Sequence, residues 1–201
     1  MLDAASTLQR HEASPMRRQV YVMLFGLIAA TGLRVSEALN LRLDDLLPGG
    51  ILHIRKTKFG KSRLVPLHPT VRDVLDGYLM LRRDVVGEDD HLFLSARGRK
   101  IGYAVANKAY RNMLQLAGIA LGRARRPRIH DLRHSFATRV LEQGGAGRES
   151  IARRAVALMT YMGHSDLRYT YWYLQATPAL MGEVASAAEA LVAGDGPGDG
   201  Q

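Results

Sequence analysis

Six side chains in this sequence have the chemistry needed to break and rejoin a phosphodiester bond. They are Arg34, Lys58, His130, Arg133, His164 and Tyr173. Attack on a phosphodiester builds negative charge on the non-bridging oxygens, and guanidinium groups that bind these oxygens bidentately stabilise the transition state more than the ground state. We expect Arg34 and Arg133 to supply two such groups.

The attacking and leaving groups also need proton partners. An unperturbed tyrosine titrates near pH ~10, so a phenol nucleophile needs a base or hydrogen-bond partner, and the departing 5′ oxygen needs a proton. Lys58, His130 and His164 are the candidates for these roles. His130 and Arg133 are three positions apart in a predicted helix, which places them on one face where they can address the same phosphate.

The elements that must position these groups are mainly helical. Residues 17–30 are apolar on most faces, which predicts a buried helix, and Gly32 can end it. This places Arg34 at a helix boundary. Ser36 then resembles the N-cap of a second, short helix that ends near Leu41.

In residues 51–67 the apolar residues recur at every second position on either side of a lysine-rich turn around Gly60. This pattern predicts a β-hairpin. Lys58 lies in this turn, from which it can reach into a neighbouring groove. The alternative is that Lys58 is a solvent-exposed charge beside an edge strand, where it would discourage pairing with the strands of other molecules. If the register is shifted, Lys56 and Lys61 compete for the same role.

The remaining pattern predicts a helix over 69–82, a short strand over 92–94, a helix over 102–117 closed by Gly118, and a helix from about His130 to Glu142. The core face expected for the first of these helices comprises Val71, Val74, Leu75, Tyr78 and Leu79. The sequence therefore predicts an α+β fold that is mainly helical, with a small antiparallel hairpin or sheet at one edge.

His164 and Tyr173 cannot both face inward from one continuous helix. They are nine positions apart, and 3.6 residues per turn places them on roughly opposite faces. Gly163 can stop the preceding helix, and Ser165 or Asp166 can cap a new one. His164 then lies at the junction, and Tyr173 lies two turns into the new helix.

Four blocks of the sequence resemble the tyrosine recombinase (phage integrase) family in the family's order. They are residues 30–39, residues 58–67, residues 130–138, and residues 162–165 followed by Tyr173. With the segments around them they extend from about Arg17 to Val192. The resemblance implies a tyrosine-recombinase-like catalytic domain over 17–192. Residues 1–16 are polar without a clear period and are expected to form a partly disordered leader, and the Gly/Asp-rich residues 193–201 are expected to form a flexible tail. Full-length members usually have a further N-terminal helical domain that clamps DNA.

Each functional position of the family is matched by a residue here. The resemblance implies that Arg34 and Arg133 are the catalytic arginines, Lys58 the hairpin lysine, His130 and His164 the two histidines, Tyr173 the nucleophile and Glu37 an acidic support residue. It implies site-specific cleavage and rejoining of double-stranded DNA through a 3′-phosphotyrosine, without a metal ion or other cofactor. It also implies self-association on DNA through a helix after Pro178.

The charge distribution agrees with a polyanionic partner. The net charge is +9 and the sequence pI is about 10.2, which favours salt-sensitive binding to nucleic acid. Residues 97–154 contain 14 basic and 3 acidic residues, a net charge of +11, so the rest of the chain carries −2. The predicted DNA-contacting residues are Arg97, Arg99, Lys100, Arg123, Arg125, Arg126 and Arg128. The alternative is a solvated basic face.

Other functions are less consistent with the sequence. There is no cysteine, which excludes disulfides and thiolate metal sites, and no stretch is apolar enough for a membrane span or laid out as a signal peptide. We expect a cytoplasmic protein.

His130 and His134 have the spacing of a helical metal pair, but a zincin needs glutamate in place of Asp131 and a third metal ligand. Two alternatives remain open: a truncated DNA-binding remnant without efficient turnover, and a type IB topoisomerase-like enzyme. Tyr161, Tyr169 and Tyr171 are expected to pack or to lie at the rim of the site, because only Tyr173 has the spacing from His164 that the family's nucleophile has.

Overall fold

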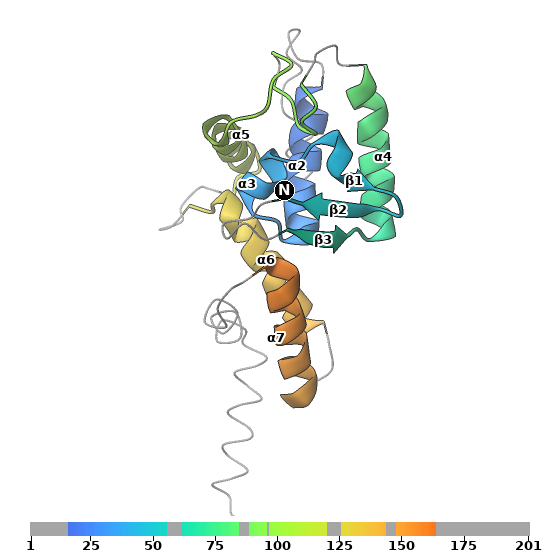
Figure 1. Ribbon diagram of the computed structural model, residues 1–201. Helices are drawn as coiled ribbons and strands as arrows, with labels where there is room; N and C mark the ends of the chain where they lie inside the picture. Colours follow the sequence, from blue (N-terminus) through green and yellow to red (C-terminus); the bar gives the residue numbers. More distant parts are fainter. Residues whose placement is uncertain are drawn as a thin grey trace, which may run out of the picture. The chain divides into compact units, whose positions relative to one another are not determined.

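The computed structural model describes residues 16–55, 62–84, 89–95, 97–119, 126–143 and 148–163 of the chain (Figure 1). The chain divides into two compact units, Met1–Phe136 and Ala137–Gln201. The first unit contains the small sheet and most of the predicted site, so it is described first. In the described part of the chain, no helix is both long and apolar enough to cross a bilayer.

Helix α2 (Arg17–Thr31) forms the centre of the first unit. Its apolar residues are buried on most faces, as the sequence predicts, and the helix contacts both α3 and α4. The ring of Phe25 on α2 lies edge-to-face against Tyr110 of α5, with 5.2 Å between the ring centroids. The helix ends at Gly32, which has φ of 63° and donates its N–H to the carbonyl of Ile28. The predicted stop at this glycine is confirmed.

The short helix that follows begins earlier than its pattern predicts. Helix α3 spans Val35–Leu39, and its N-cap is Arg34, not Ser36. The reason is Glu37, whose carboxylate accepts the main-chain N–H of Arg34 at 2.9 Å. An acid three positions into a helix can satisfy the amide of the N-cap residue without any hydroxyl. The expectation for Ser36 was therefore wrong.

The predicted hairpin is present and has a third strand. Strands β2 (Ile51–Ile54) and β3 (Arg63–Pro66) pair antiparallel, with Ile54 opposite Arg63. Strand β1 (Leu46–Leu47) adds to the other edge of β2, after the 3₁₀ turn η1 (Leu43–Asp45). Burial alternates along β2, as a period of two predicts. The turn of residues 56–61, which includes Lys56, Lys58 and Lys61, lies outside the described residues.

Helix α4 (Pro69–Arg83) is confirmed, but its buried face differs from the prediction. Leu75 and Tyr78 are buried as expected, whereas Val74 is exposed. The third buried residue is Arg82. Its guanidinium donates to the carbonyls of Asp89 at 2.7 Å and His91 at 3.2 Å, which makes burial of the charge tolerable. Hydrophobic periodicity cannot anticipate a buried arginine that binds a loop.

Residues 92–94 do not form the predicted strand. They are buried, but their pairing is limited to isolated bridges, between His91 and Arg42 and between Leu94 and Lys100. The main-chain N–H of Leu92 donates to the carbonyl of Leu41 at 2.8 Å. An apolar run of this length is buried here as a looped segment that crosses the end of α3, rather than as part of the sheet.

Helices α5 (Tyr103–Leu116) and α6 (Ile129–Glu142) agree with their predicted ranges. Gly118 follows α5 with φ of 66°, as expected for a residue that closes a helix. Helix α5 contacts α3. Helix α6 begins in the first unit and ends in the second, and its first turn carries Ile129 and Leu132 as buried apolar residues.

The second unit is described from Ala137 through the end of helix α7 (Arg148–Met162). Ala155, Leu158 and Met162 of α7 are buried. Gly163 follows the helix with φ of 64°, which agrees with the predicted stop. His164, Tyr173 and everything after them lie outside the described residues.

Candidate active site

Arg133 lies deep inside the first unit. Its position on α6, next to the buried Leu132, directs the side chain inward, and only 2% of it is exposed. One guanidinium nitrogen, Nη1, donates to the main-chain carbonyl of Gly32. Gly32 lies two positions before Arg34, so the guanidinium of Arg133 contacts the segment that leads directly to the other predicted catalytic arginine.

Gly32 is required at this position for two reasons. Its positive φ disfavours any residue with a Cβ atom. A Cβ there would also lie 2.9 Å from Cε1 of Phe136 and closer still to its Cδ1. The close approach of Phe136 to the end of α2 brings the first turns of α6 against the junction of α2 and α3.

Arg34 is held by Glu37 through both main chain and side chain. Besides accepting the amide of Arg34, the carboxylate accepts Nη1 of the same residue at 2.9 Å. A second arginine, Arg63 of β3, binds both carboxylate oxygens as a fork, at 2.9 Å through Nη1 and 2.7 Å through Nη2. Burial by itself would raise the pKa of Glu37, but the hydrogen bonds and charges of Arg63 and Arg34 outweigh it and leave the pKa below its usual value.

Arg63 was not among the predicted site residues. Its signal in the sequence was weak, because an arginine at the start of an edge strand is ordinarily solvated. The informative feature was Glu37, an acid between buried apolar residues of α3, since such a carboxylate needs cationic partners.

His130 lies on the exposed side of α6, one turn before His134. The two rings meet edge to face with centroids 4.6 Å apart. Partial burial, followed by the positive charges of His134, Arg133 and Arg128, lowers the pKa of His130 below 6.5, and Asp131 opposes this only in part. A neutral imidazole at neutral pH can donate one hydrogen bond and accept another.

A cleft of about 640 Å³ opens beside Arg34. Four of its lining side chains are arginine or lysine and two are acidic, so the cleft has an excess of positive charge. The charged and imidazole side chains that define it include Arg34, Glu37, Arg42, His53, Arg55 and Lys100. Such a surface suits a phosphate backbone, because phosphate contacts are made mainly by arginine, lysine and main-chain amides.

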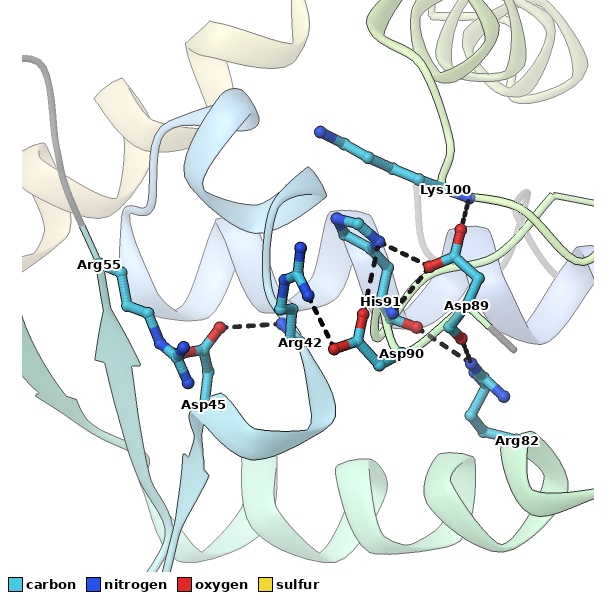
Figure 2. A network of polar contacts seen from close by, with 8 residues as sticks. All are labelled: Arg42, Asp45, Arg55, Arg82, Asp89, Asp90, His91 and Lys100. Atoms are coloured by element: carbon cyan, nitrogen blue, oxygen red, sulfur yellow. Dashed lines mark hydrogen bonds and ion pairs between the residues drawn. The ribbon is translucent and has the colours of Figure 1, made fainter. Parts of the chain in front are cut away.

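Cations along the cleft wall have polar partners, and Figure 2 draws Arg42 and Arg55 beside theirs. Arg42 pairs with Asp90 at 2.9 Å, and Arg55 pairs with Asp45. The ammonium group of Lys100 contacts the side-chain oxygen of Asn40. These contacts favour particular orientations of the exposed cationic side chains, which reduces the entropy that the side chains lose on binding a ligand.

Asp89, Asp90 and His91 place potential metal-ligand atoms within 4.8 Å of one another. The carboxylate oxygens of Asp89 and Asp90 already accept hydrogen bonds or form ion pairs within the protein. Asp89 accepts the main-chain amides of His91 at 3.0 Å and Lys100 at 2.8 Å, and it pairs with the ring of His91 at 2.6 Å. These hydrogen bonds, above all the one from the main-chain amide of His91, lower the pKa of Asp89 to about 2. The cluster therefore closes the 89–100 loop (Figure 2).

The family model of the phage integrase family matches residues 1–179. The chain belongs to this family. A relative from Sinorhizobium fredii, y4rB, named as an integrase/recombinase, is 36% identical over 179 residues, which are 87% of this chain and 57% of its own. The tyrosine recombinase XerC of Agrobacterium fabrum is 35% identical over 80% of this chain and 47% of its own. This chain thus spans about half the length of the curated relatives that it matches.

The fold is that of a tyrosine recombinase catalytic domain. The crystal structure of XerA recombinase superposes with a TM-score of 0.69 at 27% identity, over 93% of this chain and 61% of that one. A post-cleavage complex of XerH site-specific recombinase, bound to palindromic difH substrate, has the same TM-score at 24% identity. The match covers 94% of this chain and 50% of the XerH chain. The predicted family and fold class are both confirmed.

In this member of the phage integrase family, the predicted site residues fall into two groups. Arg34, Glu37, His130 and Arg133 are described, and all four belong to the first unit. Lys58, His164 and Tyr173 lie outside the described residues. Among the predicted DNA-contacting residues, the described ones are all exposed, namely Arg97, Arg99, Lys100, Arg126 and Arg128, whereas Arg123 and Arg125 lie outside the described residues.

Proposed function

We propose that the chain contains the catalytic domain of a site-specific DNA recombinase, extending over about residues 17–192. The observation that carries the proposal is the convergence at the end of α2 in a member of the phage integrase family. The guanidinium of Arg133 binds the carbonyl of Gly32, and Arg34 follows two positions later, held by Glu37. Two arginines from distant helices that meet at the end of α2 are suited to bind one phosphate from two sides.

The proposed reaction is a transesterification. The phenolic oxygen of Tyr173 attacks the scissile phosphorus, the bond from phosphorus to the 5′ oxygen breaks, and a 3′-phosphotyrosine forms. Arg34, Arg133 and His130 hold the non-bridging oxygens, His164 assists by hydrogen bonding, and Lys58 gives a proton to the departing 5′ oxygen. Because one phosphoester replaces another, a 5′ hydroxyl of a second strand can reverse the step without ATP.

The proposed partner is double-stranded DNA. The proposal is supported by the exposed basic residues in the described part of 97–128 and by the positively charged cleft beside Arg34. It is also supported by the DNA-bound state of the XerH structure to which the fold is similar.

We also propose self-association on DNA through the C-terminal helix after Pro178, and a cytoplasmic location, because the substrate of the reaction is intracellular DNA. The arginines supply the charge stabilisation, so the proposed mechanism uses no metal ion or other cofactor.

The test is covalent trapping on nicked DNA. The 201-residue chain is incubated with a pool of nicked duplexes of randomised sequence. Where cleavage occurs a few nucleotides from a nick, the short fragment between the cleavage site and the nick, which carries the released 5′ hydroxyl, diffuses away and leaves the adduct trapped. Adducts that resist denaturing detergent are digested and analysed by mass spectrometry. We expect DNA linked to the peptide that contains Tyr173, loss of the adduct in Tyr173→Phe, and its retention in Tyr171→Phe.

Other outcomes identify other functions. Salt-sensitive binding without any adduct would indicate a DNA-binding remnant instead. Relaxation of a supercoiled plasmid that carries no paired sites would indicate a topoisomerase-like enzyme. An adduct on a different tyrosine would overturn the assignment of the nucleophile while leaving the class of reaction intact.

A further inference from the structure

The carboxylate of Glu37 joins two segments that are distant in the sequence. Four hydrogen bonds converge on it: two come from Arg34, through its amide and its side chain, and two come from the fork of Arg63. The side chain of Glu37 is only 6% exposed, so water contributes little to its solvation. Removal of either arginine would leave a buried carboxylate with half of its donors.

The two arginines differ in what they can reach. The side chain of Arg34 is 26% exposed and lines the cleft. The side chain of Arg63 is 13% exposed, and it is not among the described residues that line the cleft. Arg63 can therefore affect a ligand in the cleft through Glu37, which lines the cleft and binds Arg34.

Arg63 is also the first residue of β3, opposite Ile54 at the end of β2. The segment between these two strands contains Lys58, the predicted general acid. The fork from Arg63 to Glu37 thus ties the start of β3 to the helix start that carries Arg34. A bidentate arginine–carboxylate pair fixes both distance and orientation, which a single hydrogen bond does not.

We propose that Arg63 is a positioning residue, which through Glu37 sets the orientation of Arg34. The inference rests on the proposed function for its effect on catalysis, but the orientation of Arg34 is a property of the protein without DNA. A small displacement of a catalytic group can cost about 100-fold in rate, so loss of the fork affects the chemical step more than DNA binding.

The experiment compares Arg63→Met and Arg63→Lys with Arg82→Met. Arg82 is a matched control because it is also buried and binds two acceptors, yet its contacts are to the 89–91 segment. The first readout is the single-turnover rate of adduct formation at saturating nicked DNA. We expect a decrease of about 10- to 100-fold in Arg63→Met, a smaller decrease in Arg63→Lys, an unchanged dissociation constant for intact DNA, and the wild-type rate in Arg82→Met.

A double-mutant cycle separates positioning from a general loss of structure. In a Glu37→Gln background, Arg63→Met should reduce the rate by less than twofold, because the residue through which it acts is already altered. If the two substitutions reduced the rate by independent factors, or if Arg63→Met reacted at the wild-type rate, the positioning role would be overturned.

A second readout does not depend on activity. Nuclear magnetic resonance of the guanidinium Nε of Arg34 should show a rigid side chain in wild type and in Arg82→Met, and a mobile one in Arg63→Met. The pKa of Glu37 should rise in Arg63→Met. If the wild-type protein formed no adduct, the proposed function would fail, and this measurement would still decide the inference. An equally rigid Arg34 in Arg63→Met would refute it.

Discussion

The guanidinium of Arg133 donates to the main-chain carbonyl of Gly32, 101 positions earlier in the sequence. This single contact ties the start of α6 to the junction between α2 and α3. It satisfies a carbonyl at a helix end, where intrahelical partners are missing, and it gives a buried cation an acceptor. The contact thus serves folding and the arrangement of the proposed site together.

Replacement of Arg133 by methionine tests the structural part of this role. The substitution keeps most of the apolar volume but removes a charged hydrogen bond, so we expect the free energy of unfolding to fall by about 1.5–3 kcal/mol. Urea denaturation measures it. Arg139→Met, on the exposed side of the same helix, should change stability by less than about 0.5 kcal/mol. A stabilised Arg133→Met would mean that the cost of burying the charge exceeds the value of its bond.

Gly32→Ala tests the close approach of Phe136. The alanine suffers both the strain of a positive φ, about 1–2 kcal/mol, and the overlap with the phenylalanine ring, so unfolding should become easier by more than the strain alone. Gly118→Ala is the matched control, because Gly118 has φ of 66° and an added Cβ there would contact nothing within 4 Å.

A double substitution isolates the contribution of the ring. Phe136→Ala should be destabilising by itself, but Gly32→Ala should cost less in its presence than in wild type, with a coupling of about 1 kcal/mol. Additive effects in urea denaturation would show that the ring moves aside freely.

The sequence predicts helix positions well here because apolar periodicity and glycine stops act locally. Gly32, Gly118 and Gly163 each end a helix where expected. The start of α3 was misplaced because its cap depends on an arginine amide and an acid three positions later. The same spacing recurs at Arg42 with Asp45 (2.9 Å) and at Arg128 with Asp131 (2.7 Å), so the pattern of arginine, two residues and an acid could have been recognised as a helix-start signal.

Long-range polar pairing was beyond the sequence pattern. The exposure of Val74 and the burial of Arg82 depend on where the 89–91 segment returns to α4. The fork between Arg63 and Glu37 joins residues 26 positions apart, and neither periodicity nor propensity encodes such a pairing. The family resemblance identified Glu37 as a support residue, but it did not identify the second arginine that Glu37 binds.

Two arginines in Figure 2 should differ sharply in their effect on stability. Arg42 pairs with Asp90, and both side chains are nearly half exposed, at 49% and 45%. Arg42→Met should therefore lower the free energy of unfolding by at most about 1 kcal/mol. Arg82 is buried and binds two main-chain carbonyls, so Arg82→Met should cost about 2–4 kcal/mol. Urea denaturation compares them, and equal effects would contradict the assigned difference in burial.

His130 should make the protein less stable as the solution becomes acidic. Its pKa in the folded protein lies below 6.5, mainly because of burial and then because of nearby positive charges. The unfolded chain therefore binds a proton more readily, and the free energy of unfolding falls as the pH drops from about 6.5 towards the folded pKa, with no further loss below it. In His130→Gln this part of the pH dependence should be absent from urea denaturation curves.

Neighbouring charges should move the pKa of His130 in opposite directions. Arg128 lowers it and Asp131 raises it, so Arg128→Gln should shift the titration of the His130 ring upward and Asp131→Asn should shift it downward. Asparagine keeps an oxygen that can accept the amide of Arg128, so α6 should still begin at the same residue. Proton chemical shifts of the ring measure both effects. Shifts of the same sign in the two variants would show that altered burial, rather than charge, controls this histidine.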